Sequence, residues 1–374
     1  MTSTREWDTN LRTGLHPILH LLDDDRITNI QANGFNDIWV KGYGWKGSRR
    51  VSEVGWENFE HFKIGCIRVS QVINRPIHAG RPLLNGRLPG GERVNIAIPP
   101  ACERIALTIR KFPAVPLRFP ELEQNGSLSG DIRDLCSALV RLRRSILVSG
   151  GTDAGKTTLL NALTTSFEEH ESVVTLEDAR ELRILQPNWR AMETVEPYEK
   201  DVQPVTMADL VRNVFRQNPD RIVVGEVRGE EAFYMLRTFS SGHRGGLSTV
   251  HANDAEDALH QVQLLAQMAP VAGLTAPTIA SLVGRAVDVV IHQAFDEDAG
   301  HRRIMEIVEL EPPGMRISPE GVIEYRFRRL VEWKRETGDW AFPCRPSGMS
   351  LAGVKRLGLR WPAASLTAPE RGER

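Results

Sequence analysis

The chain has 374 residues, of which 41% are apolar and 25% are charged, and its formal net charge is −1. This length predicts two domains of ordinary globular composition, and the near-zero charge excludes a global attraction to nucleic acid or to a membrane. The charged start of the chain is not a signal peptide, and no segment is apolar enough to span a bilayer. Four scattered cysteines form no CxxC pair, which indicates neither a disulfide framework nor a zinc site. We therefore expect a cytoplasmic protein.

Residues 1–112 are predicted to form a smaller mixed α and β domain. The pair Asn33-Gly34 is a hairpin-turn signal between two short β-prone runs. Residues 113–130 contain three prolines and show little periodicity, which predicts a linker. The elements expected in the first domain are strands at 27–31 and 37–41, a helix at 56–73, and strands at 93–98 and 105–112.

Short apolar runs alternate with amphipathic segments between residues 131 and 312. This alternation predicts an α/β domain, in which parallel strands carry helices on both faces of the sheet. Asn253 and Glu256 are expected to form a capping box at the start of one helix. Residues 313–374 are locally basic, and their sequence predicts no fold. The expected strands are 145–149, 173–176, 221–224, 247–250 and 287–292, and the expected helices are 132–141, 157–167, 207–217, 232–239 and 253–268.

Residues 150–157 fit the phosphate-binding pattern G-x-x-x-x-G-K-[ST]. Glycines in this pattern allow successive backbone N–H groups to face phosphate oxygens, Lys156 neutralises phosphate charge, and the Thr157 hydroxyl can bind Mg²⁺. An apolar strand precedes the loop and a helix follows it, which is the context that the pattern requires. The predicted nucleotide contacts are Gly150, Gly151, Thr152, Asp153, Ala154, Gly155, Lys156, Thr157 and Thr158.

Carboxylates and a histidine follow later apolar strands. Residues 177–181 (Glu-Asp-Ala-Arg-Glu) come after one strand, residues 224–228 (Val-Gly-Glu-Val-Arg) after another, and His251 ends a third. Ligands of α/β sheets bind at the carboxyl ends of the strands, so these side chains would face a nucleotide there. Hydrolysis needs one carboxylate to orient water and another to hold the water shell of the metal. The alternatives are that the acids cap helices and that the histidine is structural.

These segments, taken together, resemble the four sequence boxes of the secretion ATPase superfamily in order and spacing. That family powers type II secretion, type IV pili, Tad pili and type IV (conjugative) secretion, and the resemblance covers roughly residues 20–312. The chain lacks the tetracysteine module of many type II members, and it is most similar to the conjugal-transfer and Tad (CpaF-like) branch. The matching segments are 91–95 and 107–112 in the first domain and 150–157, 177–181, 224–228 and 242–253 in the second.

The resemblance implies a RecA-like P-loop NTPase core and a smaller α+β, PAS-like N-terminal domain. It implies ATP as the nucleotide with Mg²⁺, a homo-hexamer, and contact with inner-membrane components of a secretion or pilus machine, peripheral on the membrane. Gly225 stands where many other NTPases have a metal-binding Asp, as is usual in this family. By resemblance, the functional residues are Glu181 and Glu226 as catalytic acids, Lys156, His251 as the γ-phosphate sensor, and Arg93 and Arg110 as arginines that close over the nucleotide.

Three other classes of protein can contain a phosphate-binding loop, but they fit the rest of this sequence less well. A nucleic-acid-dependent RecA-like motor ATPase would carry a basic stripe interleaved with aromatic residues, and the core has none. We therefore do not expect nucleic acid to be required. A GTPase would carry an Asn-Lys-x-Asp run, and the chain has none. An inactive scaffold would lack some of the acids, and all of them are present.

Overall fold

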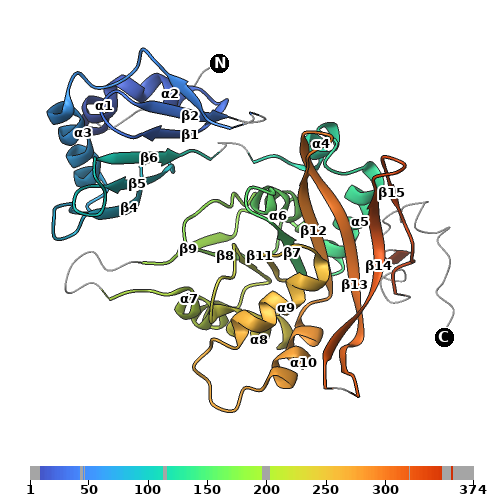
Figure 1. Ribbon diagram of the computed structural model, residues 1–374. Helices are drawn as coiled ribbons and strands as arrows, with labels where there is room; N and C mark the ends of the chain where they lie inside the picture. Colours follow the sequence, from blue (N-terminus) through green and yellow to red (C-terminus); the bar gives the residue numbers. More distant parts are fainter. Residues whose placement is uncertain are drawn as a thin grey trace. The chain divides into compact units, whose positions relative to one another are not determined.

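The computed structural model describes residues 9–42, 45, 47–112, 116–195, 203–319, 321–347 and 355–356. The chain divides into two compact units (Figure 1). Unit 1 comprises Met1–Ala114 with Pro197–Gln203, and unit 2 comprises Val115–Glu196 with Pro204–Arg374. No helix within the described ranges is long and apolar enough to cross a membrane.

Unit 1 is an antiparallel sheet packed against short helices. The predicted hairpin is present, since β1 pairs antiparallel with β2 and Ala32 lies opposite Ile38. Buried apolar side chains from the helices and from alternate strand positions form a single core. The strands, in sheet order, are β3 (Arg49–Val51), β2 (Ile38–Gly42), β1 (Ile27–Ala32), β6 (Ala106–Arg110), β5 (Arg93–Ala97) and β4 (Leu83–Arg87). The helices are α1 (Thr9–Leu15), the 3₁₀ turn η1 (His16–Ile18), α2 (Leu19–Asp23) and α3 (Phe59–Val72).

Unit 2 is built on one sheet, to which the described residues contribute nine strands. The predicted parallel pairing is present from β12 through β9, and the strands after β12 add an antiparallel extension. The sheet order is β15 (Asp339–Ala341), β14 (Ile323–Lys334), β13 (His301–Ile317), β12 (Val289–Asp296), β7 (Ile146–Gly150), β11 (Leu247–His251), β10 (Arg221–Val224), β8 (Val173–Glu177) and β9 (Trp189–Glu193).

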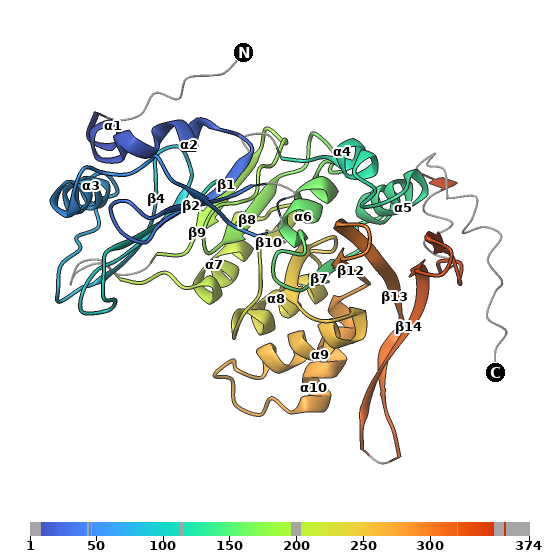
Figure 2. The same ribbon diagram turned by 45° about the horizontal axis from the view of Figure 1, so that its top comes forward.

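Helices cover both faces of this sheet (Figure 2). Side chains alternate along each strand, so that Leu147 of β7 packs into one apolar cluster while Ile146 and Val148 pack into the other. One cluster includes α4 (Phe119–Gln124), α5 (Gly130–Arg141) and α6 (Lys156–Thr164). The other includes α7 (Met207–Val214), α8 (Glu231–Ser240), α9 (Ala255–Ala266) and α10 (Ala276–Ala286). The 3₁₀ turn η2 (Phe215–Gln217) follows α7.

The structure contains elements that were not expected from the sequence, such as β9 and α10, and it differs from three of the stated expectations. Helix α4 lies inside the segment predicted as a linker, because Phe119 and Leu122 are buried against the second domain's core. The cap of α9 is Asp254, which accepts a hydrogen bond from the backbone N–H of Asp257, so the capping box predicted from Asn253 is wrong by one residue. The segment without a predicted fold contains the end of β13 together with β14 and β15.

A buried ion pair joins the start of β10 to the turn before β8. Nε of Arg221 donates to Oε1 of Glu171 at 3.0 Å, and only 1% and 2% of the two side chains are exposed. The Arg221 guanidinium also lies 4.9 Å from the centre of the Phe167 ring. Nη2 of Arg143 donates to the same Glu171 oxygen at 2.7 Å, so Glu171 has two cationic partners.

We predict that Arg221→Ala lowers the free energy of unfolding by about 1.5–3 kcal/mol, because a buried hydrogen bond between charged groups is lost while Arg143 still pairs with Glu171. The matched control is Arg316→Ala, which removes an exposed pair with Glu324 and changes stability by less than about 1 kcal/mol. Urea denaturation followed by tryptophan fluorescence measures both. If the two substitutions lowered the free energy of unfolding equally, the buried ion pair of Arg221 would not contribute more to stability than an exposed pair.

Candidate active site

The predicted phosphate-binding loop connects the central strand β7 to helix α6. Gly155 precedes α6 and has a φ of +92°, a backbone conformation that residues other than glycine rarely adopt. A Cβ atom there would also lie 2.8 Å from Cδ of Arg302. The other predicted nucleotide contacts lie in this loop or in the first turn of α6, and they are Gly150, Gly151, Thr152, Asp153, Ala154, Lys156, Thr157 and Thr158.

Lys156, the first residue of α6, folds back over the loop. Its Nζ donates to the carbonyl oxygens of Gly150 at 3.1 Å and Gly151 at 3.0 Å. It also lies 3.3 Å from Nδ1 of His251. Burial lowers the pKa of Lys156, and the nearby Glu226 carboxylate opposes that change. The ammonium group is therefore held by backbone carbonyls at the place where phosphate oxygens would bind.

His251 and Glu226 meet beside this lysine. His251 ends β11 directly opposite Gly150 of β7, and its Nε2 lies 2.8 Å from Oε1 of Glu226. That oxygen accepts no directed hydrogen bond from the described residues. Burial and the charge of Lys156 lower the pKa of His251, so the imidazole is neutral at pH 7. A neutral ring can accept a proton or a hydrogen bond next to the loop.

Arg228 holds the second oxygen of Glu226. Its Nε donates to Oε2 of Glu226 at 2.7 Å, and its Nη2 contacts the same oxygen. Nη1 of Arg228 lies 3.6 Å from Oδ2 of Asp178, which follows β8. The sequence prediction assigned no role to Arg228, although it lies within the motif that was quoted for Glu226. Arg228 thus links the acidic ends of β8 and β10.

Glu181 lies at the same edge of the sheet, in the segment after β8. Its backbone N–H donates to Oε1 of Glu177 at 2.8 Å, and the N–H of Leu182 donates to the same oxygen at 2.9 Å. Only 3% of Glu177 is exposed. Burial, opposed by these two hydrogen bonds, raises the pKa of Glu177 to about 7. The sequence prediction gave Glu177 no separate role.

Two further residues beside the loop were missed by the sequence prediction. Nε of Arg302, on β13, donates to the carbonyl oxygen of Asp153 at 2.6 Å. Gln293 of β12 is 2% exposed, and its Oε1 has no hydrogen-bond partner among the described residues. Both residues lie more than a hundred positions after the loop in the sequence, and no local pattern marks them.

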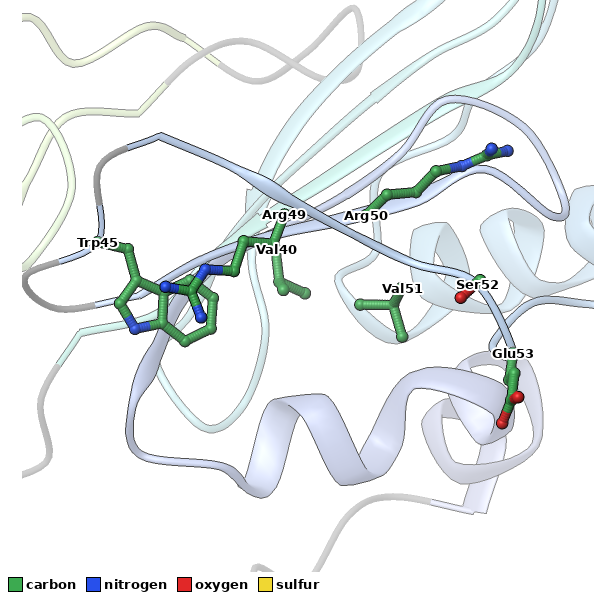
Figure 3. Close-up of a pocket in the computed structure, with 7 residues that line it drawn as sticks. All are labelled: Val40, Trp45, Arg49, Arg50, Val51, Ser52 and Glu53. Carbon is green, nitrogen blue, oxygen red and sulfur yellow. The ribbon is translucent and has the colours of Figure 1, made fainter.

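The two predicted arginines belong to unit 1. Arg93 of β5 lies directly opposite Arg110 of β6 in the antiparallel register. Unit 1 also has a shallow hollow of about 380 Å³, beside which the Arg49 guanidinium lies 4.3 Å from the centre of the Trp45 ring (Figure 3). This hollow includes neither predicted arginine. Its lining residues are Val40, Trp45, Arg49, Arg50, Val51, Ser52 and Glu53.

A phosphate-binding loop after a central parallel strand, with carboxylates at the ends of neighbouring strands, is the arrangement of a P-loop nucleoside triphosphatase. The family described as Type II/IV secretion system protein matches residues 12–309. The chain belongs to this family, so the resemblance predicted from the sequence motifs is confirmed. It is a secretion ATPase.

Relatives in two bacteria support this assignment. The type IV secretion system protein PtlH of Bordetella pertussis is 34% identical over 322 residues, which cover 78% of this chain and 92% of PtlH. The type IV secretion system protein VirB11 of Bartonella quintana is 30% identical over 319 residues, covering 75% and 87%. The X-ray structure of the Legionella pneumophila ATPase DotB is similar in fold, with a TM-score of 0.57 at 17% identity, covering 83% and 84%.

We predict that the titration of Glu177 makes part of the stability pH-dependent. The pKa of Glu177 is about 7 in the folded chain and 4.5 ordinarily, so the folded state holds its proton more tightly. The contribution of protonated Glu177 to the free energy of unfolding is therefore fully present below about pH 4.5, and it is lost as the pH rises through 7. Glu177→Gln removes this loss and gains up to about 3 kcal/mol relative to wild type between about pH 4.5 and 8.

Urea denaturation at several pH values measures this difference. Glu324→Gln, on an exposed surface pair, is the control for loss of one carboxylate. If the difference in free energy of unfolding between wild type and Glu177→Gln stayed constant across this pH range, Glu177 would not titrate there.

Proposed function

We propose that this chain assembles into a hexameric ATPase that hydrolyses ATP to power type IV (conjugative) secretion or pilus assembly. The observation that carries the proposal is the convergence of Lys156, His251 and Glu226 beside the phosphate-binding loop. The proposed architecture is a RecA-like core that contains residues 131–312 and a PAS-like domain at residues 1–112. The names of the relatives PtlH and VirB11 support the type IV system.

The nucleotide phosphates are proposed to bind over the start of α6. The first N–H groups of a helix have no partners inside the helix, and they suit an anion. Lys156 would exchange the carbonyl oxygens of Gly150 and Gly151 for phosphate oxygens. The half-buried Thr157 hydroxyl at this helix start fits a Mg²⁺ ligand. The metal ion would neutralise phosphate charge, which is the chemistry that it supplies in phosphoryl transfer.

Two carboxylates are proposed to act on the attacking water. Glu226 is held by Arg228 within reach of His251, so its carboxylate is oriented before the nucleotide arrives. Glu181, from the neighbouring segment, supplies the second acid. Neutral His251 is suited to sense the γ-phosphate, because it can donate one hydrogen bond to a phosphate oxygen. The carboxylates would orient the attacking water or accept its proton, and His251 would contact the γ-phosphate.

We predict that Glu226→Gln keeps ATP binding and lowers the rate of hydrolysis by at least about 100-fold, because only the transition-state interaction is removed.

We predict that Lys156→Ala loses hydrolysis, because phosphate charge is left uncompensated. Phosphate release measures turnover, and a fluorescent ATP analogue measures binding. Glu256→Gln, at an exposed position early in α9, is the control. Wild-type turnover in either site variant would show that the site is wrongly assigned.

The paired arginines of unit 1 support a second anion contact. Arg93 and Arg110 lie directly opposite each other on neighbouring strands, so two cationic side chains leave the same face of the sheet. Arginine is suited to phosphate because its planar fork donates two hydrogen bonds and stays charged. We propose that this anion is a bound nucleotide, and that ring closure places it at a subunit boundary.

We predict a homo-hexamer that is stabilised by nucleotide, because ligand binding shifts assembly by mass action. Arg110→Ala lowers turnover by about tenfold or more, as expected for an arginine that stabilises transferred phosphate. Arg104→Ala, on an exposed turn of the same unit, is the control. Light scattering with a non-hydrolysable ATP analogue measures the assembly. A monomer that persists at tens of micromolar with full turnover would contradict the ring.

The proposed location is cytoplasmic, peripheral on the inner membrane. Its proposed partners are inner-membrane components of the secretion or pilus machine, and nucleic acid is not required for turnover. A turnover rate that rises with added DNA and falls steeply with salt would instead indicate a nucleic-acid-dependent motor.

A further inference from the structure

The segment that carries Glu181 has no helix or strand of its own. Residues 178–188 are irregular in the structure, between β8 and β9. Two apolar side chains of this segment, Leu182 and Ile184, are buried in the cluster that contains Leu159 and Leu163 of α6. Irregular backbone is held in place only by such packing and by side-chain hydrogen bonds. The position of the Glu181 carboxylate therefore depends on contacts from outside the segment.

Two buried side chains hold three consecutive backbone N–H groups of this segment. Oε1 of Glu177 accepts from the N–H groups of Glu181 and Leu182. Oδ1 of Asn161 accepts from the N–H of Arg183 at 2.9 Å, and Asn161 is 6% exposed. Asn161 lies on α6, five residues after Lys156. These hydrogen bonds join the segment to β8 on one side and to the helix of the phosphate-binding loop on the other.

Glu177 is also packed against the backbone that carries Glu226. A Cβ atom added at Gly225 would lie 2.9 Å from Cγ of Glu177, so only glycine leaves room for this side chain. The backbone N–H of Gly225 donates to the carbonyl oxygen of Leu176, the residue before Glu177. Glu177 thus lies between the backbone of one proposed catalytic acid and the backbone of the other.

We propose that Glu177 and Asn161 are positioning residues that set the place of Glu181 relative to the phosphate-binding helix and Glu226. The inference rests on the proposed catalytic role of Glu181. Each side chain acts through the backbone N–H groups of the segment. Displacing a reacting group by about 1 Å can lower the rate about 100-fold, so loss of these hydrogen bonds lowers turnover while nucleotide binding is retained.

The test is a double-mutant cycle on ATP turnover, with the variants Glu177→Ala, Glu181→Gln and both together in the full-length chain. Glu177→Ala lowers kcat about 10- to 100-fold and changes the Kd of a fluorescent ATP analogue by less than about threefold. If Glu177 acts only through Glu181, it has no further effect in the Glu181→Gln background, because the two losses are then not additive.

Glu177→Gln keeps an oxygen acceptor for the two N–H groups, and its kcat stays within about threefold of wild type. Gln186→Ala is the matched control, since this buried side chain donates to the carbonyl oxygen of Phe167 from the same segment, five residues beyond Glu181. It lowers the melting temperature without a comparable loss of kcat.

Asn161→Ala, taken through the same cycle with Glu181→Gln, keeps the test decisive if Glu177→Ala does not fold. The positioning role would be overturned if the fold-reductions in kcat of the two single variants multiplied in the double variant. It would also be overturned if the folded Glu177→Ala or Asn161→Ala variant kept the wild-type kcat. Wild-type turnover of Glu181→Gln itself would instead overturn the proposed function of that acid. The two failures are therefore distinguishable.

Discussion

The parallel register of β7, β11, β10 and β8 is the constraint on which the site depends. It places His251 opposite Gly150, and Val224 opposite Leu176, so the residues that follow these strands emerge at one edge of the sheet. A slip of one residue in any pair would turn every side chain of that strand to the opposite face. The buried apolar side chains on both faces prevent such a slip, because each strand would have to expose one set and bury polar groups in the other. The same packing that stabilises the core therefore aligns the chemistry.

Several charged groups at this edge pair with one another. Lys156 donates to two loop carbonyls, His251 lies between Lys156 and Glu226, and Arg228 neutralises the remaining oxygen of Glu226. A buried charge without a partner would cost several kcal/mol, so these contacts stabilise the lysine and the acid at this edge of the sheet.

The sequence predicts those parts of the fold and of the site that depend on local pattern. Apolar periodicity locates β7, β8, β10 and β11, and glycine spacing locates the loop, because both signals lie within a few residues. The contacts of Glu177 and Asn161 with the segment at 181–183 were not predictable, since they join side chains to backbone N–H groups across an irregular stretch. The cap at Asp254 was missed because Asn253 is an equally good capping residue one position earlier. Strands β9 and β15 lie at the sheet edges, where partial exposure weakens the apolar pattern.

Strands β12 and β13 support the phosphate-binding loop through residues that no local sequence pattern marks. Asp153 and Gly155 both have positive φ angles, of +59° and +92°, a conformation that glycine adopts readily and aspartate only uncommonly. Arg302 of β13 donates to the carbonyl oxygen of Asp153, and Gln293 of β12 lies close to Gly155. These contacts hold the loop in its shape from outside. β12 pairs with β7 and with β13, so the register that fixes His251 on one side of β7 also delivers Arg302 on the other. Residues of β12 and β13 therefore contact the phosphate-binding loop on one side of β7. On the other side of β7, β11 places His251 beside the same loop.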